Sequence, residues 1–289
     1  MKLPAPAAPR GDLANVALPA PEALPSWARP FVAGKRFVGK TWTIVGLEAR
    51  KLRHDPTELL TRTVQPALWL LIFGEVFSHI RAIPTGNKPY LDFMAPGILA
   101  QSVLFIAIFA GIAIIWERDL GVVHKFLASP TPRTALVLGK ALSSGVRGLA
   151  QAVIIYILAA LLGVQVNLNP LALLGVILIV VLGAACFSTF SLIIACLVKS
   201  RERFMGIGQV LTMPLFFASN AIYPVSIMPG WLQVIARANP LSYMVDALRN
   251  LMLAGGTITA GLALDFGVML GATIGLVLIG AALYPRVVR

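Results

Sequence analysis

Residues 116–140 read WERDLGVVHKFLASPTPRTALVLGK and form the longest polar island between two strongly apolar runs. Residues 95–116 before the island carry no charge, and residues 141–163 after it carry only Arg147. A helix needs about 20 apolar residues to cross the hydrocarbon core of a bilayer. The two runs therefore predict membrane-spanning helices, and the island predicts the loop that joins them.

The island also has a helical pattern of its own. Asp119 stands near its start, where a carboxylate stabilises a helix N-terminus, and Pro130 and Pro132 end the pattern. Apolar residues recur at helical spacing in between, at Val122, Val123, Phe126 and Leu127. The pattern favours a short amphipathic helix beside the membrane, a surface on which a soluble partner can dock. The alternative is a solvated loop that only connects two spans.

Composition assigns the chain to the integral membrane proteins. Hydrophobic residues make up 58% of its 289 residues and charged residues only 12%, whereas soluble domains are about 45–50% apolar. The net charge of +12 does not indicate nucleic-acid binding, because the basic residues cluster at the ends of apolar runs. Cys186 and Cys196 lie in one apolar run, which favours simple packing over a disulfide or a metal site.

Six apolar runs predict six transmembrane helices. They are residues 63–77 (extending toward 59 or 80), 95–116, 141–163, 171–198, 204–223 and 261–284. The run 171–198 exceeds the bilayer thickness and is expected to tilt or to bend near Gly183. Six spans place both termini on one side, and all 24 Lys and Arg residues lie on that side except Arg81, Lys88, Arg237 and Arg249. By the positive-inside rule, both termini and the polar island are cytoplasmic.

Three further segments lie outside these runs. Residues 1–35 are rich in Pro and Ala and predict a disordered cytoplasmic tail. Residues 36–60 mix apolar and basic residues as a helix in the membrane interface does, or as an ordinary basic juxtamembrane segment does. Residues 225–257 are too polar to span and too apolar for a free loop, and Pro, Gly and Asn divide them into two amphipathic pieces. They predict short helices that dip into the membrane or lie on it. Such helices either cover the outer end of a transport path or only anchor the sixth span.

Over residues 48–284 the chain resembles the membrane subunit of type-2 ABC exporters, the permeases of drug, lipid and polysaccharide export. The most specific match is residues 214–249, PLFFASNAIYPVSIMPGWLQVIARANPLSYMVDALR. The family pattern is met there by Pro214, Pro224, Pro229 with Trp231, Asn239, Pro240 and Leu241 with Tyr243, and Asp246 with Arg249. Weaker matches are Arg53, Asp55 and Pro56, the tetrapeptide APGI at 95–98, Glu117, Arg118 and Gly121, and LASP at 127–130.

The resemblance implies an all-α transmembrane domain over residues 36–289, multi-pass in the cytoplasmic (inner) membrane of a prokaryote. It implies a connecting helix at 36–56, re-entrant helices within 225–257, and a coupling helix at 117–130 that docks on a separate ATPase subunit. The coupling residues are Glu117, Arg118, Gly121, Lys125, Leu127 and Pro130, and the outer residues are Pro224, Pro229, Trp231, Asn239, Pro240, Tyr243, Asp246 and Arg249. The matching permeases work as dimers with two ATPase subunits, so a homodimer among membrane lipids is expected.

The sequence has no phosphate-binding loop of its own. Near Gly139 and Lys140, Thr134 stands where the first Gly is needed and Ala141 where Ser or Thr is needed. We therefore expect a transport subunit rather than an enzyme, with no catalytic residue, cofactor or metal. ATP and Mg would then bind the partner ATPase.

Other classes fit the sequence less well. An ion-coupled secondary transporter needs ionisable residues near the midplane, whereas Glu75, Arg147, Asp246 and Asp265 are expected near span ends or in the outer segment. Asp246 and Arg249 are three residues apart, which predicts a local pair on one helix. An intramembrane enzyme would show a motif such as His-Glu-x-x-His, which is absent. Phe dominates the aromatic residues of the spans, which favours a hydrophobic or amphiphilic substrate, although the same residues suit helix packing. A lipid-linked saccharide or polysaccharide is the alternative substrate.

Overall fold

The computed structural model describes residues 57–80, 89–121, 133–198, 200–255 and 260–284, together with Gly39 and Gly46. In these ranges the regular elements are helices, with an isolated antiparallel bridge between Val166 and Leu253. The expected all-α fold is therefore confirmed. The predicted tail and, apart from the two glycines, the predicted connecting helix at 36–56 lie outside the described residues.

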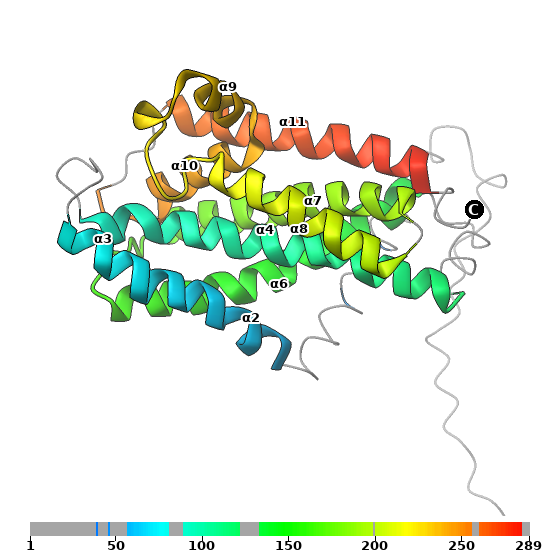
Figure 1. The fold of residues 1–289 in the computed structure, drawn as a ribbon, viewed down its shortest axis with the longest axis horizontal. Coiled ribbons are helices and arrows are strands. Elements are labelled where there is room, and N and C mark those ends of the chain that lie inside the picture. The colour runs from blue at the N-terminus through cyan, green and yellow to red at the C-terminus, as the bar shows by residue number, and fades with distance from the viewer. Residues whose placement is uncertain are drawn as a thin grey trace, which may run out of the picture.

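Within the described ranges, four helices are long and apolar enough to cross a membrane. They are Tyr90–Asp119 (α4), Leu136–Leu161 within α6 (Arg133–Leu161), Pro170–Leu197 (α7) and Gly261–Leu283 within α11 (Ala260–Leu283). They correspond to the second, third, fourth and sixth predicted runs. Figure 1 shows them side by side along one axis, together with α8 (Arg201–Phe217).

The third run is longer than predicted, and this changes the place of one charge. Because α6 begins at Arg133 rather than near 141, Arg147 lies near the middle of the helix and not close to one end. The prediction failed because Leu136 and Val137, within the polar island, are buried against the ends of neighbouring helices. Burial of these two side chains stabilises additional helical turns before the apolar run begins.

The first and fifth runs are also helical, but each departs from a simple span. Residues 57–80 form α2 (Thr57–Leu68), a π-helical segment η2 (Trp69–Gly74) and α3 (Glu75–Ile80). The first run was predicted to extend toward 59 or toward 80, and the helical region extends to both. Pro66, which has no N–H for the helical hydrogen bonds, lies inside α2 three residues before the π segment begins. The fifth run ends early, because α8 is 17 residues long and stops at Phe217.

The core is built around α4 and α7, which pack against each other and against α6 and α10. Small residues allow this close packing. A Cβ added at Gly97 of α4 would lie 2.8 Å from the Cα of Ala221, so the backbone after α8 passes directly over this glycine. At Gly183 of α7, the predicted bend site, an added Cβ would overlap the side chain of Met244.

The segment 225–257 is confirmed as two short helices. A 3₁₀ turn, η3 (Val225–Ile227), is followed by α9 (Gly230–Ala238) and α10 (Pro240–Met252). Figure 1 shows α9 and α10 at one end of the bundle, opposite the end at which α8 begins. The two segments singled out in the sequence, the polar island and residues 225–257, therefore belong to opposite ends of the molecule.

Candidate functional site

Asn239 holds the junction between α9 and α10. Its Oδ1 accepts a hydrogen bond from the Leu241 N–H at 3.0 Å, which caps the N-terminus of α10. Its Nδ2 donates to the carbonyl of Leu215 at 2.7 Å and to that of Ala218 at 3.3 Å, at the end of α8. Pro240 follows at the first helical position, where no N–H is required. The Asn-Pro step thus fastens the start of α10 to the end of α8.

Tyr243 and the two other prolines fix the path of the chain around this junction. The Tyr243 hydroxyl donates to the Arg237 carbonyl at 2.7 Å, which ties α10 back to the last turn of α9. Pro224 immediately precedes η3, and Pro229 immediately precedes α9. Each proline stands where a helix begins, a position that suits its fixed φ angle.

A charged cluster lies one turn further along α10. Arg249 Nη1 donates to Asp246 Oδ1 at 3.1 Å, so the predicted pair is confirmed. Asn220 Nδ2 also donates to Asp246 Oδ1, at 2.6 Å, and the Asn220 carbonyl accepts from Arg249 Nη2 at 2.9 Å. The guanidinium lies 3.9 Å from the ring centroid of Phe93 on α4, a cation–π contact. The cluster therefore joins α10 to α4 and to the turn after α8.

The electrostatics of this cluster suit a structural contact. Burial raises the pKa of Asp246, while Arg249 and the hydrogen bond from Asn220 act in the opposite direction. Asp265, near the start of α11, is close enough to Asp246 to interact with it electrostatically. The sequence pattern predicted the pair three residues apart but missed Asn220 and Phe93, because no local spacing relates them to α10.

The apolar faces of the two short helices differ in exposure: that of α10 is buried and that of α9 is exposed. In α10, Met244, Leu248 and Leu251 are buried in the core. In α9, Trp231 and Val234 are each 68% exposed, so its apolar face points away from the rest of the described chain. An exposed Trp on an amphipathic helix is typical of a surface that meets the membrane interface.

At the opposite end, the structure corrects the predicted boundary between the second span and the coupling segment. Helix α4 continues through Glu117 and Arg118 to Asp119, so Asp119 lies in the last turn of a helix and not at a helix N-terminus. Gly121 follows with φ of 71°, the left-handed conformation that commonly ends a helix at glycine. The remaining predicted coupling residues, Lys125, Leu127 and Pro130, lie outside the described residues.

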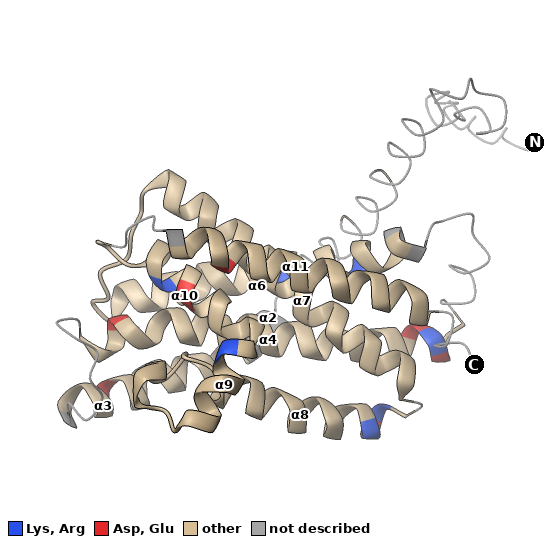
Figure 2. Cartoon of the chain, turned by 90° about the horizontal axis from the view of Figure 1, so that it is seen from above, with Lys and Arg blue, Asp and Glu red and all other residues tan. Residues whose placement is uncertain are grey.

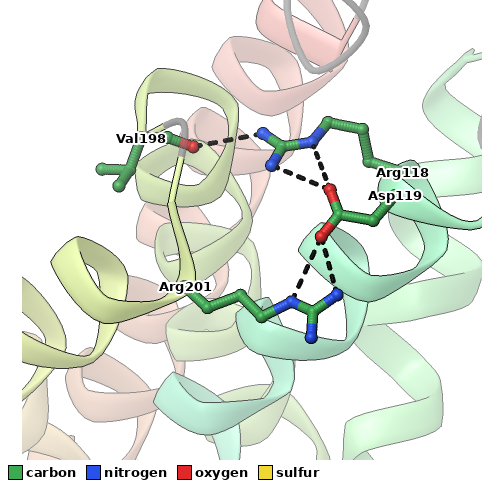
Figure 3. A network of polar contacts seen from close by, with 4 residues as sticks. All are labelled: Arg118, Asp119, Val198 and Arg201. Carbon is green, nitrogen blue, oxygen red and sulfur yellow. Dashed lines mark hydrogen bonds and ion pairs between the residues drawn. The ribbon is translucent and has the colours of Figure 1, made fainter.

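The last turn of α4 stays helical because its charges are paired with other helices. We name Arg118, Asp119, Val198 and Arg201 the Asp119 cluster (Figure 3). Asp119 Oδ1 accepts from Arg118 Nη2 at 3.1 Å, and Asp119 Oδ2 accepts from Arg201 Nη2 at 2.8 Å. Arg118 Nη1 also donates to the Val198 carbonyl at 3.4 Å. The cluster joins the ends of α4 and α7 to the beginning of α8.

A second ion pair joins α4 to α6. Glu117 accepts from Lys140, and the two side chains are only 16% and 15% exposed. Arg201 lies over the ring of Trp116 at 3.6 Å, which adds a cation–π contact at the same end. Figure 2 shows charged residues gathered where α8 begins, as the positive-inside count predicted for one end of the bundle. The sequence did not reveal the partners, because Lys140 and Arg201 are distant from α4 along the chain.

The described helices include several of spanning length, with paired charges at one end of the bundle and two short helices at the other. These are features of a multi-pass membrane protein. Residues 40–253 match the family model described as ABC-2 type transporter. The chain therefore belongs to the ABC-2 type transporter family, and the resemblance seen in the sequence is confirmed.

Several curated relatives are named as transport permeases. The chain is 28% identical over 252 residues to the daunorubicin resistance ABC transporter permease protein DrrB1 of Streptomyces coeruleorubidus, with 87% of each chain covered. It is 29% identical over 221 residues to the putative transport permease ycf38 of Cyanophora paradoxa, with 74% of each covered. It is 23% identical over 227 residues to the probable doxorubicin resistance ABC transporter permease protein DrrC of Mycobacterium tuberculosis, covering 77% of this chain and 80% of the relative. The chain is accordingly a membrane permease of the ABC type.

Proposed function

We propose that this chain is the permease subunit of an ATP-driven exporter that moves a hydrophobic or amphiphilic molecule, a drug or lipid-like compound, out across the cytoplasmic membrane of a prokaryote. Two copies of the chain form the path, and two copies of a separate ATPase subunit bind ATP and Mg. Membership of the family supports the transport role, and the two drug-resistance permeases among the relatives support the substrate class.

In this proposal, the helical segment 57–80 and α8 complete a set of six spans. The first is long enough to cross a bilayer despite its π segment. The second is short at 17 residues, and the turn that holds Asn220 extends it toward α10. Six spans place both termini in the cytoplasm, with the Asp119 cluster, while α9 and α10 lie on the outer side.

The observation that carries the coupling mechanism is the pairing at the cytoplasmic end. Closure of the ATPase dimer would push on residues 117–130, of which 117–119 form the last turn of α4. The pairs of Glu117 with Lys140 and of Asp119 with Arg201 would transmit that displacement to α6 and α8. The two permease copies would then rock against each other and open the path between them.

The test is to tag the C-terminus, extract the protein from its native membrane in mild detergent and identify what co-purifies. We expect a soluble subunit with a phosphate-binding loop, and its loss in the variant Lys125→Glu. The matched control is Lys88→Glu, which makes the same charge change in the loop expected on the outer side. A chain that purifies alone, with transport that follows a proton or sodium gradient and ignores ATP depletion, would refute the proposal.

A further inference from the structure

A cavity of about 260 Å³ lies between α2, α4 and α6. Its walls include Thr61 and Gln65 of α2, Gln101, Phe105 and Phe109 of α4, and Gln151 of α6. At a rise of about 1.5 Å per residue, Gln101 lies roughly 17 Å from the start of α4 and roughly 27 Å from its end. The cavity therefore opens at mid-helix, where an amide group has few other polar partners.

The two buried glutamines that line the cavity differ in their hydrogen bonding. Gln151 donates through Nε2 to the Thr63 hydroxyl at 3.2 Å, and that hydroxyl lies 3.4 Å from Gln151 Oε1. Gln101 is only 3% exposed, and its Oε1 accepts no hydrogen bond from any described residue. Burying a polar atom without a partner costs free energy, so such atoms call for an explanation such as a ligand.

The rest of the wall indicates what kind of ligand would supply the missing hydrogen bond. Phe105 and Phe109 present two rings with centroids 6.5 Å apart, tilted at 31°, which suit an aromatic ligand. No described residue that lines the cavity is charged, so a charged ligand would find no partner there. Pockets of this kind fix orientation with a few placed polar groups, and here Gln101 Oε1 is the acceptor that awaits a donor.

The cavity borders a second hollow on α2 and η2. This hollow, of about 490 Å³, shares Thr61 and Gln65 with the cavity and is otherwise mainly apolar. Trp69 and Phe73 stack in it with ring centroids 4.4 Å apart. Its floor is the π-helical segment, a distortion often found at functional sites. A ligand whose hydrogen-bonding ring occupies the cavity can therefore place an apolar substituent along Trp69 and Phe73.

We propose that this cavity binds a neutral aromatic molecule with a hydrogen-bond donor, an O–H or N–H group, and that Gln101 recognises the donor. This inference rests on the proposed function, because such a molecule would be a transported or inhibitory amphiphile. It assigns the specificity to one residue of α4 that no sequence motif indicated.

The test uses 4-hydroxybenzophenone, an aromatic O–H donor that attaches covalently to nearby C–H groups on illumination, and its methyl ether, which has no donor. The tagged full-length protein is illuminated in its native membrane, and the adducts are located by mass spectrometry. We expect saturable adducts on α2 and on the middle of α4. The ether should label these sites about five- to tenfold less, the equilibrium value of one neutral hydrogen bond.

Variants separate recognition from general labelling. Gln101→Leu should remove the preference for the hydroxyl probe, whereas Gln209→Leu, the same change on an exposed position of α8, should keep it. Thermal unfolding checks the fold, and Gln101→Leu should melt no lower than wild type because it removes a buried oxygen, Oε1, that has no hydrogen-bond partner. If it melts lower, Gln101→Met takes its place in the same comparison.

Labelling that is spread evenly over the apolar helices and does not saturate would overturn the inference, as would an undiminished preference in a well-folded Gln101 variant. The measurement needs neither ATP nor transport. Specific labelling without ATP-dependent export would therefore count against the proposed function alone. Export without specific labelling would count against this site alone.

Discussion

The pair between Glu117 and Lys140 gives the sharpest prediction about the end of the bundle that we propose to be cytoplasmic. Reversing either charge places two like charges side by side where both side chains are only 16% and 15% exposed. Breaking a fully buried pair costs about 3–5 kcal/mol, and the partial exposure here lowers our expectation to about 2–3 kcal/mol. The double reversal, Glu117→Lys with Lys140→Glu, restores opposite charges and should recover all but about 1 kcal/mol.

Two measurements on the same four proteins check this. Unfolding in mixed micelles with increasing sodium dodecyl sulfate gives the stability of wild type, both single variants and the double variant. Co-purification of the ATPase subunit shows whether each variant still binds this partner. Glu202→Lys is the matched control, because it reverses an exposed carboxylate in the first turn of α8 and should change stability little.

Two results would refute the reasoning. If the double variant is as unstable as the single variants, the pair does not hold α4 to α6. If the double variant is as stable as wild type but no longer retains the ATPase, Glu117 contacts the ATPase directly instead of anchoring the coupling segment.

Three other predictions concern single positions. Gly97→Ala forces a Cβ against the backbone of residue 221 and should cost about 1–3 kcal/mol in the same unfolding assay, whereas Gly271→Ala in α11 meets open space and should be neutral. Arg249→Met leaves Asp246 without its cation and should cost about 2 kcal/mol, since that carboxylate is 47% exposed. Asp119→Asn should cause a small loss of stability at low salt that disappears at high salt, because its ion pairs are exposed.

The elements that sequence patterns predicted well are those defined by local chemistry. Four of the six apolar runs are helices of spanning length, because hydrophobic length alone decides such helices. Asn239 and Pro240 divide residues 225–257 into two helices, because a cap followed by proline at the first helical position starts a helix wherever it occurs. The pair of Asp246 and Arg249 followed from helical spacing.

The errors occurred where distant residues decide the local structure. The end of α4 extends to Asp119 because Lys140 and Arg201 neutralise its last turn. The start of α6 moves back to Arg133 because the core covers Leu136. These contacts join residues that are far apart in the sequence. The apolar pattern therefore ended the predicted second span too early and began the predicted third span too late.

The basic residues at this end of the bundle have two roles that the sequence count cannot separate. The positive-inside rule counts Arg118, Lys140 and Arg201 only as cations on one side of the membrane. In the structure each of them also pairs with a carboxylate of the last turn of α4. A charge at a membrane boundary can stay hydrated without a partner, so orientation alone does not require these pairs. Because Lys140 of α6 and Arg201 of α8 both pair with this turn, a displacement of the turn would act on α6 and α8 together, as the proposed coupling mechanism assumes.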